Sequence, residues 1–241
     1  MNHTFAGKRV VITGGSAGIG LATAKALAQQ DAHVIIASRS RNKLDRAKRE
    51  IGGTCETHVL DVSNESAVKH FFDGLDGIDH LVTPAAGAAL GAFLDLPTET
   101  AREVVASKLW GQYHTAKHAA PIMGDGSSIT FFSGIVSRKA MAGASTYTLI
   151  AGAMESLTRC LALELAPIRV NCVTPGVIAT PVWERILGKD QAEQHLNSVA
   201  DLLPVGRVGA SEDVARAVIY LMSNGFATGS IIDVDGGHRC L

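Results

Sequence analysis

Residues 10–20 read Val-Val-Ile-Thr-Gly-Gly-Ser-Ala-Gly-Ile-Gly, the pattern of a buried strand, a glycine-rich turn and the first turn of a helix. Gly14 permits a tight turn, Gly18 lets the backbone approach a ligand, and Gly20 allows close packing of the helix. The free N–H groups of that helix point at the loop and make an anion site. An ordinary tight turn is the alternative. The predicted dinucleotide contacts come from Gly14, Ser16, Ala17, Gly18, Ile19 and Gly20.

The composition is that of an ordinary globular protein. Of the 241 residues, 46% are hydrophobic and 19% are charged, which implies a folded core. The formal net charge of −1 at pH 7 gives no long-range attraction to nucleic acid or to an anionic membrane. No apolar run approaches the roughly 18 residues of a membrane span, and residues 1–8 lack an apolar signal core. We therefore expect a cytoplasmic protein that binds neither nucleic acid nor membrane.

Cysteine and histidine spacing gives no metal motif. The four cysteines lack CxxC spacing, so we expect reduced thiols, buried by default. His114 and His118 stand four residues apart on a predicted helix, but the glutamate of a zinc-protease helix is missing and no third ligand is evident. We therefore predict no metal site.

Strands and helices alternate along the rest of the chain. We expect further strands at 33–37, 57–60, 79–83, 128–133, 168–174 and 230–234, and helices at 21–30, 64–75, 98–123, 147–165 and 211–222. Asn64 and Ser211 are the expected N-caps of two of these helices. This alternation predicts an α/β fold with a doubly wound parallel sheet of about seven strands and helices on both faces. Residues 1–241 are expected to form one domain, in which the long connection 176–204 is a substrate lid.

The end of the second predicted strand bears on the choice of cofactor. In a dinucleotide-binding fold an acidic residue here binds the free 2′-hydroxyl of the adenosine ribose, whereas an arginine accommodates a 2′-phosphate. This chain has Ser38 where the acid would stand, followed by Arg39 with its permanently charged guanidinium. The alternative is a solvated, charged start of the next helix. We predict that NADP(H) is preferred over NAD(H).

Several spaced motifs, in the right order and over nearly the whole chain, resemble the short-chain dehydrogenase/reductase family. They are Thr13-Gly14-x3-Gly18-Ile19-Gly20, Leu60-Asp61-Val62, Arg169-Val170-Asn171-x3-Pro175-Gly176, Thr180-Pro181 and Val234-Asp235-Gly236-Gly237. The resemblance implies a three-layer Rossmann fold, a nicotinamide dinucleotide, and oxidoreduction of a carbonyl/alcohol pair. It places Asp61 and Val62 near the adenine, and Pro175, Gly176 and Ile178 along the nicotinamide.

The catalytic pattern of that family is only partly present. The family uses a tyrosine, a lysine four residues later, a serine about thirteen residues earlier and an asparagine on the preceding long helix. Tyr147 matches the tyrosine, but Ala151, Gly134 and Lys108 stand at the other three positions, with Ser133 beside Gly134. In addition, Thr83-Pro84-Ala85-Ala86 replaces the family's Asn-Asn-Ala-Gly, and a proline there cannot donate a backbone hydrogen bond.

The missing lysine leaves the role of Tyr147 open. A free phenol has a pKa near 10, so without a neighbouring cation it is a poorly matched proton donor. Tyr147 is either the proton donor and acceptor or a packed phenol at a helix start. Two functions follow. One is hydride transfer between a nicotinamide and a small carbonyl compound or secondary alcohol; the other is dinucleotide binding without that chemistry, by a sensor or scaffold.

Lys108 offers a replacement for the missing lysine. Ala151 leaves space, and the long side chain of Lys108 reaches toward Tyr147 from the opposite helix, where a cation would lower the pKa of the phenol. Ser133 or Ser145 would then hold the substrate oxygen, although neither has the spacing of the family. The alternative is that Lys108 faces solvent or pairs with Glu103 on its own helix.

Small residues on the predicted helices 98–123 and 147–165 favour close approach of helices. The resemblance implies oligomers built on this helix pair, so we expect a symmetric homotetramer or homodimer.

Overall fold

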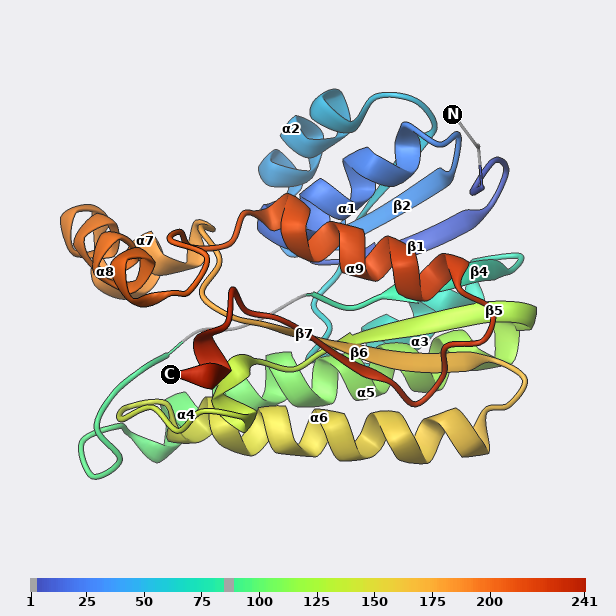
Figure 1. The fold of residues 1–241 in the computed structure, drawn as a ribbon. Helices are drawn as coiled ribbons and strands as arrows, with labels where there is room; N and C mark the ends of the chain where they lie inside the picture. The colour runs from blue at the N-terminus through green and yellow to red at the C-terminus, as the bar shows by residue number, and fades with distance from the viewer. Residues whose placement is uncertain (1–3, 85–88) are drawn as a thin grey trace.

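The computed structural model describes residues 4–84 and 89–241. Its core is a seven-stranded sheet in the order β3-β2-β1-β4-β5-β6-β7, in which every neighbouring pair is parallel (Figure 1). The strands are β1 (Arg9–Thr13), β2 (His33–Ser38), β3 (Cys55–Val59), β4 (Ile78–Val82), β5 (Met123–Phe132), β6 (Arg169–Pro175) and β7 (Ile231–Val234). The predicted doubly wound α/β fold is confirmed.

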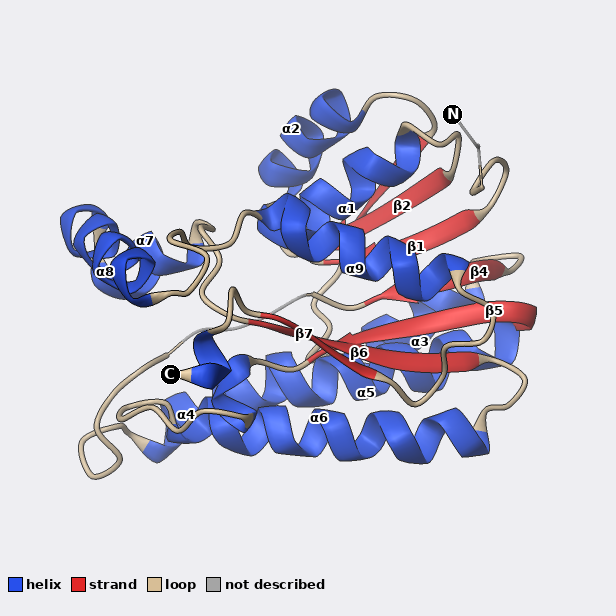
Figure 2. Cartoon of the chain, in the orientation of Figure 1, coloured by secondary structure: helices blue, strands red, loops and turns tan. Residues whose placement is uncertain are grey.

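Helices cover both faces of the sheet (Figure 2). One layer holds α1 (Gly18–Ala28), α2 (Arg41–Ile51) and α9 (Ser211–Ser223); the other holds α3 (Glu65–Asp73), α4 (Thr98–Val105), α5 (Gly111–Ala119) and α6 (Ser145–Glu164). Side chains alternate along each strand, so Val10 and Ile12 enter the core under the first layer while Val11 enters the core under the second. Both faces of the central strands are therefore buried, as their apolar sequences require.

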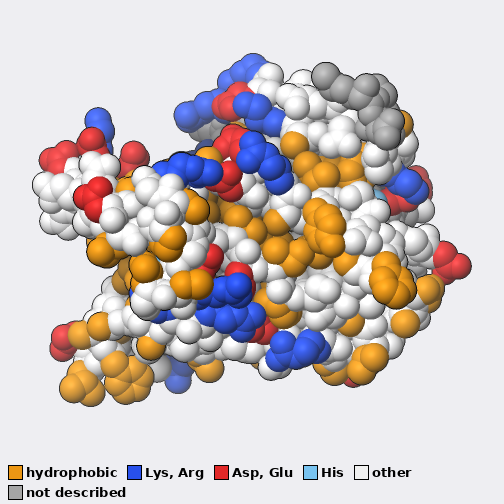
Figure 3. Space-filling view, in the orientation of Figure 1, with side chains coloured by type: hydrophobic (Ala, Val, Ile, Leu, Met, Phe, Trp, Pro, Cys, Tyr) orange, Lys and Arg blue, Asp and Glu red, His pale blue; other side chains and the backbone are white. Residues whose placement is uncertain are grey.

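The connection between β6 and α9 departs from the sheet. The α7 helix (Val182–Leu187) and the α8 helix (Lys189–Leu202) project from one side of the molecule, as Figures 1 and 3 show. A short helix, η4 (His238–Cys240), follows β7 near the carboxyl end. No helix in the described part of the chain has the length and apolar character needed to cross a membrane.

The predicted helix 98–123 is interrupted in its middle. After α4 the chain forms a π-helix, η1 (Ala106–Trp110), then α5 and a 3-10 turn, η2 (Ala120–Ile122). Strand β5 begins at Met123 rather than at the predicted residue 128, because Met123 pairs with Ile78 and the register then shifts before Ser128 pairs with His80. The π-helix carries Lys108, and such turns are frequent at functional sites.

Of the other local predictions, some are confirmed and some are wrong. Asn64 caps α3 as expected, since its Oδ1 accepts a hydrogen bond of 3.1 Å from Ala67 N. Ser211 is not a cap: it is the first residue of α9, and the side chain of Asp213 accepts from Ala210 N at 2.8 Å instead. All four cysteines are free, but Cys160 and Cys240 are exposed because they lie on the outer side of α6 and in η4, whereas Cys55 and Cys172 are buried.

Candidate active site

A cavity of about 770 Å³ lies at the carboxyl ends of the strands, where parallel sheets bind their ligands. It is bounded by the glycine-rich turn, the ends of β2, β3, β5 and β6, the start of α6, and α7. The structure brings all the predicted site residues to its walls: Gly14, Ser16, Ala17, Gly18, Ile19, Gly20, Ser38, Arg39, Asp61, Val62, Lys108, Ser133, Tyr147, Pro175, Gly176 and Ile178.

The glycine-rich turn forms one end of this cavity. Gly14 and Gly18 have φ angles of +79° and +52°, and a Cβ atom on Gly20 would lie only 2.4 Å from the carbonyl oxygen of Gly14. Helix α1 therefore starts directly against the turn. Its N-cap, Ala17, makes no side-chain cap and its first turn has no acidic residue, so the free N–H groups and the positive helix end suit a diphosphate.

The end of β2 fits the ribose side of such a ligand. Ser38 Oγ is buried and has no hydrogen-bond partner in the described part of the chain, and buried hydroxyls are normally paired. Arg39 lines the same wall, and Ser40 begins α2 as its cap. After β3, Asp61 Oδ1 accepts hydrogen bonds from Ser63 N (3.0 Å) and Ser63 Oγ (2.7 Å), which fixes the turn at this edge of the cavity. These residues fit a nicotinamide dinucleotide.

Tyr147 lies in the first turn of α6 at the other end of the cavity. Burial raises the pKa of its phenol, while a hydrogen bond with the backbone of Ala89 and the charge of Arg185 act in the opposite direction. The phenol is therefore protonated at neutral pH and able to donate a proton.

Lys108 reaches Tyr147 from the π-helix. Its Nζ lies over the phenol ring, 5.9 Å from the ring centroid. The side chain is half-buried, and burial lowers the pKa of Lys108 to about 8. The alternative pairing with Glu103 is not seen, and in the described residues no hydrogen bond or carboxylate engages Nζ. The nearby Cys172 brings no charge, because burial raises the pKa of its thiol to about 12.

At the positions where the family has its catalytic serine and lysine, this chain has Gly134 and Ala151. Gly134 lines the cavity but brings no hydroxyl, and Ala151 is buried in α6 and does not line the cavity. Ser133 lines the cavity, but its Oγ donates to the carbonyl oxygen of Ala151 (3.2 Å) and to Glu155 Oε1 (3.1 Å). The hydroxyl of Ser133 thus points into α6, so a role in holding the substrate oxygen would require it to leave these partners.

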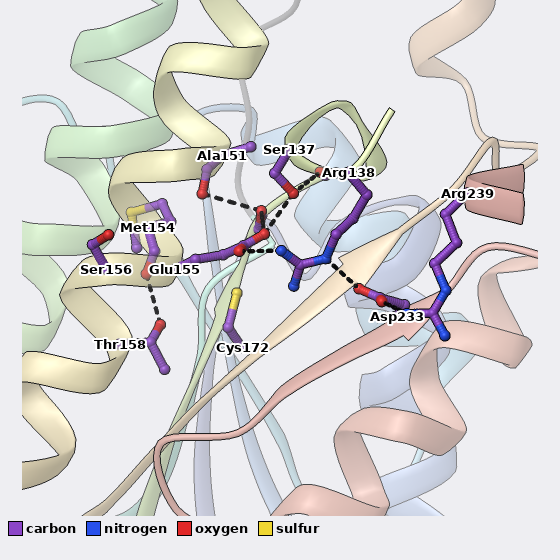
Figure 4. A network of polar contacts seen from close by, with 12 residues as sticks. Ser137, Arg138, Ala151, Met154, Glu155, Ser156, Thr158, Cys172, Asp233 and Arg239 are labelled. Atoms are coloured by element: carbon purple, nitrogen blue, oxygen red, sulfur yellow. Dashed lines mark hydrogen bonds and ion pairs between the residues drawn. The ribbon is translucent and has the colours of Figure 1, made fainter. Parts of the chain in front are cut away.

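A buried charge network supports this wall of the cavity, as Figure 4 shows. Glu155 accepts hydrogen bonds from Ser137 Oγ (2.5 Å) and Arg138 Nη1 (2.7 Å), and Arg138 Nε lies 3.4 Å from Asp233 Oδ1. Arg239 contacts the same Asp233 from η4. The network ties α6 to η3 (Ile135–Ser137) and β7. Sequence reasoning missed it, although a glutamate on an otherwise apolar helix face was a usable signal.

Gln112 was missed as well. It is buried in α5, and its Nε2 donates to the carbonyl oxygens of Lys108 (2.7 Å) and Phe132 (2.9 Å). Its Oε1 accepts from Phe132 N and from Thr83 Oγ1, both at 2.8 Å. Gln112 therefore fixes the backbone that carries Lys108 to the ends of β4 and β5. Of the unusual stretch after β4, Ala85 and Ala86 lie outside the described residues.

His114 and His118, the two histidines on α5, both lie near the carboxylate of Glu65. His118 Nε2 lies 3.2 Å from Glu65 Oε1, and His114 Nε2 lies 3.7 Å from Glu65 Oε2. Lys117 Nζ also binds Glu65, at 2.8 Å. Over residues 4–84 and 89–241, no group of three histidine, cysteine, aspartate or glutamate side chains is arranged to hold a metal ion.

In comparisons with known proteins, the chain is similar to reductases over nearly its whole length. The family model described as enoyl-(acyl carrier protein) reductase matches residues 14–239. The mouse L-xylulose reductase (Mus musculus) is 32% identical over 245 residues, covering 98% of each chain. Carbonyl reductase family member 4 of Xenopus laevis is 34% identical, over 95% of this chain and 97% of the relative.

Solved structures agree in fold. A small-chain dehydrogenase in complex with NADPH is 33% identical, with a TM-score of 0.83, over 98% of this chain and 100% of the other. A short-chain dehydrogenase/reductase from Brucella melitensis is 27% identical, with a TM-score of 0.91, over 98% of both chains. Each of these relatives and solved structures matches 95% or more of this chain, so the likeness includes all the elements that form the cavity.

Proposed function

Because the chain belongs to the short-chain dehydrogenase/reductase family, we propose that it is an NADP(H)-preferring oxidoreductase of small carbonyl compounds and secondary alcohols. The observation that carries the proposal is that Tyr147 and Lys108 lie at one end of the cavity whose other end is formed by the glycine-rich turn and Ser38. A nicotinamide dinucleotide, when bound, supplies or accepts the hydride.

The chain's own residues handle the proton. In the reducing direction the phenol of Tyr147 donates its proton to the carbonyl oxygen, so that an alcohol and a phenolate result. A phenolate in this buried position is costly, and the charge of Arg185 offsets part of that cost. Lys108, whose Nζ lies over the ring, is the second cation that would stabilise the phenolate. Lys108 thus takes the place of the lysine missing at Ala151, and Pro175, Gly176 and Ile178 face the nicotinamide.

The test is turnover by Tyr147→Phe. With NADPH and a panel of small ketones and aldehydes, we expect the wild type to oxidise NADPH and the variant to lose about 10²- to 10⁴-fold in kcat, the usual contribution of a general acid. NADPH binding, followed by its fluorescence, should change little because phenylalanine keeps the ring and the glycine-rich turn and the end of β2 are untouched. Equal kcat in the two proteins would exclude Tyr147 as the proton donor.

A second candidate function is dinucleotide binding without turnover, as in a sensor or scaffold. It is favoured by two features of the same site: Gly134 has no hydroxyl, and Ser133 Oγ is committed to Glu155. NADPH binding with no turnover of any carbonyl compound would support this alternative.

The proposal includes how the protein is built and where it acts. Residues 1–241 form one domain, and the segment 176–204, which holds α7 and α8, closes over the substrate. The chain acts in the cytoplasm as a homotetramer or homodimer. Support for assembly comes from the outer side of α6, where Leu149 and Leu163 are 62% and 82% exposed. Trp110 of η1 is exposed as well and lines a small surface pocket together with Ala153 and Leu157 of α6.

A further inference from the structure

We propose that the substrate is a short oxo acid, whose carboxylate binds Lys108 Nζ while its carbonyl group faces Tyr147. This inference rests on the proposed oxidoreductase function and adds the chemical class of the substrate. It starts from a cation in the cavity that the protein itself leaves without an anion.

The first step is the missing counter-charge. An ammonium group that is withdrawn from water is stabilised by pairing with an opposite charge. Among the described residues none is paired with Lys108, and residues 1–3 and 85–88 contain no aspartate or glutamate in their sequence. The buried acid of this wall, Glu155, is already bound by Arg138, Ser137 and Ser133. A ligand in the cavity is therefore a source of the anion that the protein does not supply.

The second step is the balance of charge at this end of the cavity. Glu184 and Arg185 of α7 both line it and bring one charge of each sign, and both are exposed. The other charged lining residues, Arg39, Lys43 and Asp61, follow β2 and β3 at the opposite half of the sheet. Lys108 is thus the surplus positive charge where the substrate reacts, and a monoanionic substrate neutralises it.

The third step is distance. Lys108 Nζ lies 5.9 Å from the centroid of the Tyr147 ring, on the face of the phenol. A carbonyl oxygen bound to the phenol and a carboxylate bound to Nζ must therefore be close together in one molecule. Oxo acids with the carboxylate one or two carbons from the carbonyl satisfy this spacing. An anion further along a chain would pass beyond the lysine.

The experiment compares acids with their neutral counterparts. Reduction by NADPH is measured for 2-oxobutanoate against methyl 2-oxobutanoate, and for 3-oxobutanoate against methyl 3-oxobutanoate. The variants are Lys108→Met, which keeps an apolar stem without the charge, and Lys108→Arg, which keeps the charge. Lys69→Met is the matched control, because Lys69 pairs with Asp73 on the surface of α3, outside the lining of the cavity.

A binding measurement accompanies the kinetics. Calorimetric titration of the NADPH complex with oxamate, an unreactive oxo-acid mimic, is compared with titration by the neutral oxamide. Loss of one charge-assisted contact should weaken oxamate binding by Lys108→Met about 10- to 100-fold and leave oxamide binding unchanged. Lys108→Arg should retain part of the preference, and Lys69→Met all of it.

Several outcomes overturn the inference. Equal kcat/KM for acid and ester in the wild type, or a preference for acids that survives Lys108→Met, would do so while leaving the oxidoreductase function standing. The same holds if Lys108→Met weakens NADPH binding and leaves the ratio of oxamate to oxamide affinity unchanged, because the lysine would then bind the cofactor. If no carbonyl compound is turned over, the proposed function fails, and the oxamate titration still decides the ligand of Lys108.

Discussion

Lys108 is a single residue whose position costs the fold free energy. Burial lowers its pKa from 10.5 to about 8, which means that the folded protein holds the ammonium form less readily than the unfolded chain does. The cost is fully present below pH 8, and it disappears between about pH 8 and 10.5, where the folded state loses the proton before the unfolded state does. Stability therefore rises with pH over this range on account of Lys108.

We predict that Lys108→Met stabilises the protein at pH 7, by up to about 3 kcal/mol, the free-energy equivalent of the shift in pKa. The gain should shrink when unfolding is measured near pH 10. Urea denaturation of the wild type and the variant at both pH values checks this. A variant that is less stable than the wild type at pH 7 would show that Lys108 has a stabilising partner.

Arg39 and Ser38 should set the choice between the two nicotinamide dinucleotides. Arg39→Ala is expected to weaken NADPH binding by about 1.5–3 kcal/mol, the value of a charge-assisted phosphate contact, and to leave NADH binding almost unchanged. Ser38 Oγ, buried without a partner among the described residues, is available to the same ribose. Fluorescence titrations with both cofactors measure the effect; equal NADPH affinity in the two proteins would remove Arg39 from the site.

At the scale of elements, the sheet contains a pH-sensitive contact between β4 and β5. His80 is buried, its Nδ1 lies 2.8 Å from Ser128 Oγ, and burial lowers the pKa of His80 from 6.5 to about 4. The folded protein thus keeps His80 neutral while the unfolded chain takes up a proton. The stability present above pH 6.5 is lost as the pH falls toward 4.

His80→Gln should flatten this dependence. Glutamine retains a hydrogen-bonding group for Ser128 but does not titrate, so the variant should avoid a loss of about 3 kcal/mol at most between pH 7 and pH 4. Urea unfolding at pH 7.5, 5.5 and 4.5 gives the difference between the two proteins, and carboxylates common to both cancel. Parallel stability curves for the two proteins would contradict the assignment.

Most helices and strands could be predicted from the sequence, whereas the arrangement of the side chains around Tyr147 could not. Val10, Val11 and Ile12 identify a buried strand without knowledge of its neighbours, because the pattern is local. The π-helix at Lys108 depends instead on Gln112, which binds the ends of two strands that are distant in sequence.

The start of β5 and the charge network could not be predicted either, because they too depend on contacts between residues that are distant in sequence. Met123 becomes a strand residue because Ile78 lies beside it, and residues 133, 137, 138, 155, 233 and 239 meet only after the whole sheet has formed. Motif spacing placed the cofactor residues at one cavity, but the direction in which Ser133 Oγ points could not be read from spacing.

At the scale of the whole molecule, one surface is suited to another copy of the chain. The outer side of α6 has Leu149 and Leu163 exposed, and a Cβ atom on Gly152 between them would have nothing within 4 Å. This glycine is therefore not needed for packing inside the chain, whereas it would allow a second helix to approach. A second apolar surface lies over α9, where Figure 3 shows apolar side chains gathered and Tyr220 is 51% exposed.

We predict that Gly152→Arg and Leu163→Asp reduce the assembly to smaller species without unfolding the protein. Light scattering at micromolar concentration measures the mass, and circular dichroism checks the fold. The control is Leu202→Asp: Leu202 is 66% exposed at the end of α8, which projects from the molecule apart from α6 (Figure 1), so the assembly of this variant should be unchanged. A wild type of 25.2 kDa in solution would contradict the prediction of an oligomer.

The carboxyl end has a practical consequence for anyone who handles this protein. Arg239 contacts Asp233 and its backbone N–H donates to Asp235, while Lys139, next to Arg138, donates to the carbonyl oxygen of Leu241 at 3.1 Å. The final residues are thus joined to the wall behind Tyr147. Loss of residues 239–241 by proteolysis during purification would deprive Asp233 of Arg239 and distort assays on an otherwise intact preparation.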